Sequence, residues 1–81
     1  MEKYVIKRNG AYLPFESYKI EEAIQKAFKS ESTAYDENLY LKVLTLLDVK
    51  ETWAVEEIQD TIEKVLFEFG QYEVMRSFML Y

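Results

Sequence analysis

Two short runs at the start of the chain are mostly hydrophobic: Lys3–Arg8, in which polar residues flank an apolar centre, and Ala11–Phe15, which is apolar throughout. Short runs rich in β-branched and aromatic residues are typical of strands. The intervening Asn9 and Gly10 predict a two-residue type I′ turn, because both turn positions require positive φ. Pro14 lacks a backbone N–H, so the second strand is expected at a sheet edge. The segment is therefore predicted to be a β-hairpin.

The two-residue turn would fix the pairing of the strands and so decide which side chains share a face. One face would be apolar enough to lie on a core, and it would carry Tyr4, Ile6, Leu13 and Phe15. The other face would be half-polar, and it would carry Val5, Lys7, Tyr12 and Pro14.

Beyond the hairpin, the hydrophobic residues recur with helical spacing in four segments. The helices are expected at Ser17 to about Lys29, Glu37–Leu47, Val55 to about Phe69, and from Tyr72 to the end of the chain. Ser17 and Asp36 are predicted N-caps of the first two helices, since their side chains can accept from free N–H groups. Gly70 is predicted to close the third helix as its C′ residue.

The connection at residues 48–54 has no helical periodicity and is a candidate third strand. Trp53 within it is expected to fill part of the core. The predicted fold class is α+β and mostly α: a single domain over residues 1–81, built as a four-helix bundle capped by a β-hairpin or a small three-stranded sheet.

Composition narrows the chemistry. The chain has neither cysteine nor histidine, which removes disulfides, thiolate nucleophiles and most zinc sites. Its formal charge of −5 is opposite to that of a typical nucleic-acid-binding domain, so nucleic acid is not an expected partner. No apolar run is long enough for a membrane span and no signal peptide is evident, so we expect a cytoplasmic protein.

Three cations stand at positions where an anion could bind. Lys7 and Arg8 fall at the hairpin tip, and Lys19 falls in the first turn of a helix, where the helix dipole already favours anions. Solvent exposure alone also accounts for each of them. The spacing of the acidic residues Glu56, Glu57 and Asp60 could suggest a site for a divalent metal ion, but a solvated helix face is the favoured interpretation.

These residues also carry a resemblance. The run V-x-K-R-x-G, followed by an apolar residue, an acid and a helix opening with K-I, resembles the ATP-cone, a nucleotide-binding regulatory module of ribonucleotide reductases. The resemblance extends over nearly the whole chain, through Val55–Asp60, Ile62, Glu63, Arg76 and Phe78–Tyr81. It implies the same helical architecture beneath a hairpin cap.

The resemblance also implies a site. Val5 and Ile20 would help to wall the base, and Lys7 and Arg8 would hold phosphates. Glu16 and Lys19 would help to fix the nucleoside and phosphate ends of the ligand. Gln59 would supply a polar contact from the third helix, and Mg²⁺ would accompany ATP or dATP. No residue would be catalytic, and the protein would not itself be an enzyme.

The implied role is allosteric control of overall reductase activity, and thus of deoxyribonucleotide synthesis for DNA replication. ATP would leave the enzyme active, and dATP would drive an inactive oligomer with other reductase subunits. The simplest interpretation is then that the segment is part of a longer subunit, and a short stand-alone regulator is the alternative. Met75 replaces a small residue common in the family, and the family commonly continues with a basic residue at the point where this sequence stops, after Tyr81. The alternative is a small acidic helical module that docks a protein partner without binding nucleotide.

Overall fold

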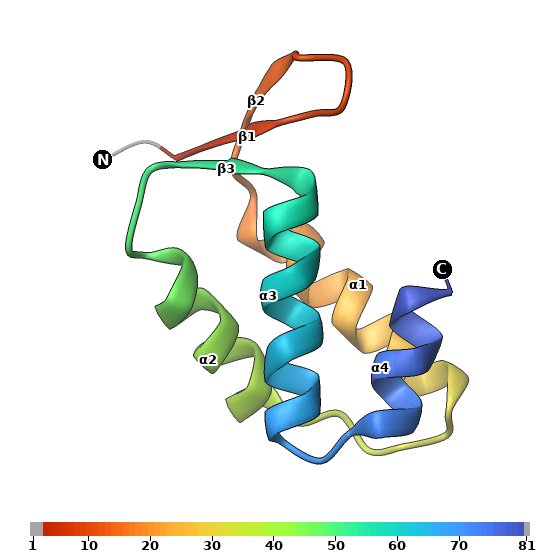
Figure 1. The fold of residues 1–81 in the computed structure, drawn as a ribbon. Helices are drawn as coiled ribbons and strands as arrows, with labels where there is room; N and C mark the ends of the chain where they lie inside the picture. Colours follow the sequence, from red (N-terminus) through yellow and green to blue (C-terminus); the bar gives the residue numbers. More distant parts are fainter. Residues whose placement is uncertain (1–2, 81) are drawn as a thin grey trace.

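A three-stranded sheet lies across one end of four helices in the computed structural model, which describes residues 3–80 (Figure 1). The elements are β1 (Tyr4–Ile6), β2 (Tyr12–Pro14), α1 (Ser17–Ser30), α2 (Glu37–Leu47), β3 (Thr52–Ala54), α3 (Val55–Glu68) and α4 (Tyr72–Met79). The predicted fold class is confirmed, and the sheet is the three-stranded alternative. Tyr81, which was expected to continue the last helix, lies outside the described residues.

The sheet has the order β2-β1-β3, with β1 antiparallel to β2 and parallel to β3. Val5 in the central strand pairs with Leu13 on one side and with Trp53 on the other. Pro14 lies in the outer strand β2, as its missing N–H predicts. The chain therefore returns to the hairpin after two helices, and β3 leads directly into α3.

The hairpin turn differs from the prediction. The N–H of Lys7 donates to the carbonyl of Ala11 at 2.9 Å, and the N–H of Gly10 donates to the carbonyl of Lys7 at 2.9 Å. Only Gly10 has positive φ, at 86°, while Asn9 accepts the N–H of Ala11 on its side-chain oxygen at 3.0 Å. The loop is thus the three-residue kind with glycine in the left-handed position, and the predicted type I′ turn is wrong.

This longer loop shifts the strand pairing by one residue and changes the faces of β1. Val5 faces the core together with Trp53, whereas Tyr4 and Ile6, which were predicted on that face, lie on the opposite one. The third strand explains the difference, because its buried tryptophan must share a face with its pairing partner. Lys7 is two residues beyond Val5, and alternate residues of a strand point to the same face, so Lys7 lies on the face toward the helices.

The core occupies the space between the sheet and the helices, where α3 packs against α2 and α4, and α1 packs against α4 (Figure 1). Trp53 is buried and donates its indole N–H to the carbonyl of Leu47 at 2.9 Å, which confirms its expected role in the core. The buried residues of the helices are Ile20, Ile24, Ala27, Phe28, Leu39, Tyr40, Val43, Leu47, Ile58, Ile62, Val65, Leu66 and Val74.

Two of the three residues predicted to begin or end a helix have the predicted role. Asp36 caps α2 by accepting the N–H of Asn38 at 2.9 Å, as predicted. Ser17 does not cap α1, because it is the first helical residue and Glu16 occupies the N-cap without a side-chain bond. Gly70, with φ of 73°, follows α3 and donates its N–H to a carbonyl of the last turn, which confirms the predicted glycine termination.

Candidate functional site

A recess lies between the hairpin turn and the first turns of α3. Lys7, Arg8 and Asn9 line it from the turn, and Val55 and Gln59 line it from the helix. The pairing of β1 with β3 turns Lys7 to this side of the sheet, whereas the predicted arrangement of the hairpin placed it on the opposite face from the core. Arg8 belongs to the loop and is not bound by strand alternation, so both cations reach the same recess.

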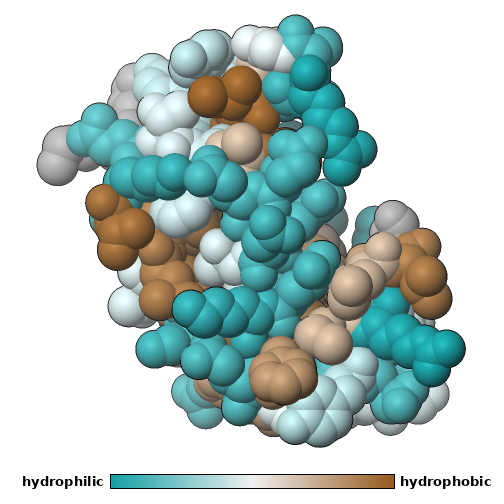
Figure 2. Space-filling view, in the orientation of Figure 1, coloured by the Kyte–Doolittle hydropathy of each residue, from teal (hydrophilic) through white to brown (hydrophobic). Residues whose placement is uncertain are grey.

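A second recess adjoins the first and runs between α1, α3 and α4, with a volume of about 270 Å³. Its lining consists of Lys19, Ile20, Ala23, Val55, Ile58, Gln59, Ile62 and Phe78. Because Val55 and Gln59 line both recesses, we treat them as one groove, called the α1–α3 groove below. In the space-filling view the outline of the molecule is indented between the hairpin end and α4 (Figure 2).

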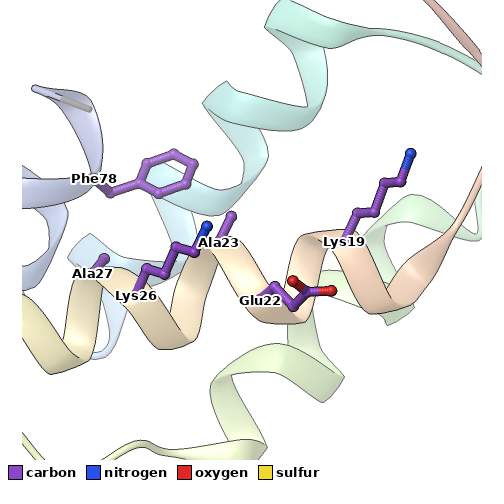
Figure 3. A pocket seen from close by; sticks show the side chains of 6 residues that line it. All are labelled: Lys19, Glu22, Ala23, Lys26, Ala27 and Phe78. Atoms are coloured by element: carbon purple, nitrogen blue, oxygen red, sulfur yellow. The ribbon is translucent and has the colours of Figure 1, made fainter.

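The groove continues as a smaller hollow between α1 and α4, where Lys19, Ala23 and Phe78 reappear in the lining. Figure 3 shows that Lys19, Ala23 and Lys26 project from the side of α1 that faces Phe78, whereas Glu22 projects to another side. Lys19 and Lys26 are seven residues apart, which is two helical turns, so their amines mark one edge of this surface.

The structure brings together five of the seven residues expected to form a site. The residues that line the α1–α3 groove are Lys7, Arg8, Lys19, Ile20 and Gln59. Val5 and Glu16 are not among the lining residues. Val5 is partly buried and packs against the core, and Glu16 lies at the N-cap of α1.

Arg8 is held by an acidic residue of α3. Its Nε lies 2.7 Å from Oε1 of Glu56, and the exposed fractions of the two side chains are 71% and 52%. The hydrogen bond from Arg8 lowers the pKa of Glu56, and the residue's own backbone N–H adds to the effect. The interpretation of Glu56 as a solvated acid of the helix surface was incomplete, since it also ties the hairpin turn to α3.

Lys19 also has an acidic neighbour, but within its own helix. Its Nζ lies 3.5 Å from Oε1 of Glu16. A hydrogen bond from Tyr18 lowers the pKa of Glu16, and the charge of Lys19 lowers it further. Among the ion pairs of residues 3–80, none includes Lys7, so this cation faces the groove without a carboxylate partner there.

Sequence reasoning missed the apolar floor of the groove. Val55, Ile58, Ile62 and Phe78 were assigned to helix packing, because they recur at helical spacing on buried faces. Each also presents part of its surface to the groove. Periodicity places a residue on the inner side of a helix, but it does not distinguish the middle of the core from its rim.

Between residues 3 and 80, no three or more acidic side chains are grouped so that they could hold a metal ion. Glu57, considered for such a role, instead accepts the N–H of Ala54 at 2.9 Å and the amine of Lys50 at 2.8 Å. No helix in the same part of the chain is both long and apolar enough to pass through a membrane.

The groove thus combines cations around the hairpin turn with an apolar floor and one amide side chain, that of Gln59. Such a site suits a ligand that has an anionic end and a flat, largely apolar end.

Comparison with known proteins gives a consistent picture. A family model described as the ATP cone domain matches residues 3–81. A curated relative is 49% identical over 69 residues: a vitamin B12-dependent ribonucleoside-diphosphate reductase of Thermoplasma acidophilum. The match covers 82% of this chain but only 9% of the relative, so the chain corresponds to a small part of that protein.

Proposed function

Because this chain belongs to the ATP-cone family, we propose that its α1–α3 groove binds ATP or dATP as an allosteric ligand. The observation that carries the proposal is the convergence of Lys7, Arg8, Lys19 and Gln59 on a groove with an apolar floor. These four residues come from the hairpin, α1 and α3, and only the fold brings them together.

In this proposal the phosphates lie at the hairpin end of the groove. Lys7 and Arg8 approach them from the turn, and Lys19 approaches from the first turn of α1, where the helix dipole adds to its charge. Arginine and lysine differ in their contributions, since arginine can bind two phosphate oxygens at once and lysine acts as a compact charge. Mg²⁺ accompanies the nucleotide and neutralises further phosphate charge.

The nucleoside lies along the apolar part of the groove. Ile20 and Val55 contact the base, and Gln59 provides a hydrogen bond from the side of α3. Val5 contributes from the sheet, where it packs against the core behind the lining residues. Glu16, which does not line the groove, helps to fix the ligand through its contact with Lys19 at 3.5 Å.

The domain acts within a larger ribonucleotide reductase. The similarity to the reductase of Thermoplasma acidophilum supports this, as does the small share of that protein to which the chain corresponds. ATP and dATP compete for the groove, and dATP favours an inactive oligomer with other reductase subunits. Such a switch requires only that the two nucleotides favour different assemblies by about 1–3 kcal/mol.

Isothermal titration with ATP and with dATP in Mg²⁺, together with light scattering, tests the proposal. We expect both nucleotides to bind and dATP alone to raise the mass of the oligomer. The variants Lys7→Glu and Lys19→Glu should abolish binding, whereas Lys64→Glu, an equal charge change on the exposed surface of α3, should not. A folded protein that gives no heat with either nucleotide would refute nucleotide binding.

A second candidate function is supported by a separate surface. Phe67 and Tyr72 are 58% and 56% exposed, and their ring centroids lie 5.3 Å apart between α3 and α4. Exposed aromatic pairs are common in protein interfaces. If the chain is only a docking module, reversing the charge of Lys7 or Lys19 leaves its binding properties unchanged, and the two functions are thereby distinguished.

A further inference from the structure

Two oppositely charged side chains connect the hairpin turn to α3 beside the groove. Arg8 comes from the turn, and Glu56 comes from the first turn of the helix, between groove residues Val55 and Gln59 in the sequence. Their contact of 2.7 Å is both a hydrogen bond and an ion pair. Arg8 is therefore engaged by a carboxylate of the protein itself.

The pair is not required by the local structure of α3. An acidic residue in the first turn is stabilised by the helix dipole whether or not a cation is nearby. Glu57, the next residue, makes the hydrogen bond that caps the helix backbone at Ala54. Glu56 can therefore release Arg8 without leaving an N–H group of α3 unsatisfied.

The pair is also easy to displace. Both side chains are more than half exposed, and exposed ion pairs are individually weak because water and salt screen them. A phosphate group carries more charge than a carboxylate and can accept both prongs of the guanidinium group. A phosphate group and the Glu56 carboxylate would thus compete for Arg8. The phosphate would displace the carboxylate, but the free energy gained on nucleotide binding would be reduced because the ion pair is broken.

We propose that Glu56 is a built-in competitor of the nucleotide: its carboxylate binds Arg8 in place of a phosphate group and lowers the affinity of the groove for polyphosphate ligands. The inference rests on the function proposed above. It assigns different roles to the two neighbouring cations. Lys7, which has no carboxylate partner among the ion pairs of residues 3–80, attracts the ligand from the start, whereas Arg8 joins only after it leaves Glu56.

The test compares Glu56→Gln with Asp60→Asn by titration with ATP in Mg²⁺. Both substitutions remove one negative charge from the exposed side of α3, but only Glu56 contacts Arg8. We expect Glu56→Gln to bind ATP about two- to fivefold more tightly than Asp60→Asn, the range set by the strength of an exposed ion pair. In an Arg8→Gln background this difference should vanish.

The outcomes separate the two proposals. If the wild-type protein binds ATP and Glu56→Gln binds no more tightly than Asp60→Asn, the competitor role is wrong while the function stands. A weaker affinity of Glu56→Gln, seen only with Mg²⁺, would overturn it in favour of a carboxylate that contacts the metal. If the folded wild-type protein binds no nucleotide, both proposals fail. The NMR signal of the Arg8 Nε–H group should move in ligand-free Glu56→Gln, which checks the contact itself.

Discussion

The amine of Lys3 and the indole N–H of Trp53 donate hydrogen bonds to the same two backbone carbonyl groups. The carbonyl of Leu47 lies 3.0 Å from Lys3 Nζ and 2.9 Å from Trp53 Nε1. The carbonyl of Lys50 lies 3.1 and 3.2 Å from the same two nitrogens. These donors satisfy carbonyls at and after the end of α2, and so attach the sheet to that helix.

Shared acceptors predict that Lys3 and Trp53 are energetically coupled. Lys3→Met or Trp53→Phe alone should lower the free energy of unfolding by about 1–2 kcal/mol, because the other donor still satisfies the carbonyls. The double variant should lose about 1 kcal/mol more than the sum, since both carbonyls then lack these partners. Chemical denaturation followed by circular dichroism measures all four proteins of the cycle.

Lys64→Met is the control for the charge change, since this exposed lysine of α3 takes part in none of the ion pairs found within residues 3–80. It should alter stability by less than about 0.5 kcal/mol. Strictly additive losses in the double variant would show that the two donors act independently.

Gly10 lies in the hairpin turn and Gly70 follows α3, so a substitution at Gly70 is a control for the same substitution at Gly10. Both have positive φ, at 86° and 73°, and a Cβ at either position would meet no atom within 4 Å. Alanine at either site should therefore destabilise the protein by about 1–2 kcal/mol through backbone strain alone. Only Gly10→Ala should also weaken ATP binding, because this glycine shapes the turn that positions Lys7 and Arg8.

Thermal unfolding and ATP titration of both variants check this prediction. Equal loss of affinity in Gly10→Ala and Gly70→Ala would mean that the effect follows stability and not the geometry of the turn. Asparagine, which tolerates positive φ better than alanine, should restore part of the stability at both sites.

The helices could be predicted from the sequence because each has its own hydrophobic period and its own end signals. Asp36 and Gly70 act on neighbouring backbone groups, so their effects can be predicted from the local sequence. The register of the hairpin could not be predicted from the local sequence. Asn9-Gly10 is compatible with more than one loop, and the choice depends on Trp53, which lies far away in the chain and fixes which face of β1 is buried.

The residues that line the candidate site were predicted only in part, for the same reason. Lys7, Arg8 and Lys19 are charged residues at element ends, where the sequence shows both their chemistry and their position. The contact between Arg8 and Glu56 joins residues 48 positions apart, and no local pattern encodes it. Phe78 enters the groove only because α4 packs beside α1.

The raised pKa of Tyr35 predicts that the protein becomes less stable in alkaline solution. Its hydroxyl donates to Glu21 at 3.1 Å, and burial, followed by this acidic partner, raises the pKa of Tyr35 well above the ordinary value of 10.0. A group whose pKa is raised by folding contributes stability that is complete below its unfolded pKa and is lost as pH rises toward the folded pKa. Wild-type stability should therefore fall above about pH 10.

Tyr35→Phe should remove that contribution. At pH 8 the variant should be less stable than wild type by about 1 kcal/mol, because one hydrogen bond to a carboxylate is lost. At pH 11 the difference in stability should shrink, because only the wild type has the Tyr35 hydroxyl, which folding keeps protonated at a cost above its unfolded pKa. Urea midpoints at the two pH values measure it, with Tyr12→Phe on the exposed outer strand as control. A constant difference would contradict the assignment.

Ala23 tests whether the nucleoside lies along the helices or only at the hairpin turn. It is partly buried on α1 and lines both the α1–α3 groove and the hollow beside Phe78. Leucine at this position would extend into open space and should leave the unfolding temperature nearly unchanged, while filling volume that the ligand requires. We expect Ala23→Leu to weaken ATP binding by about tenfold, equivalent to about 1.4 kcal/mol.

Gln25→Leu, at an exposed position of the same helix, is the control and should have no effect on affinity. Undiminished binding of ATP by Ala23→Leu would confine the ligand to the recess formed by Lys7, Arg8 and Gln59.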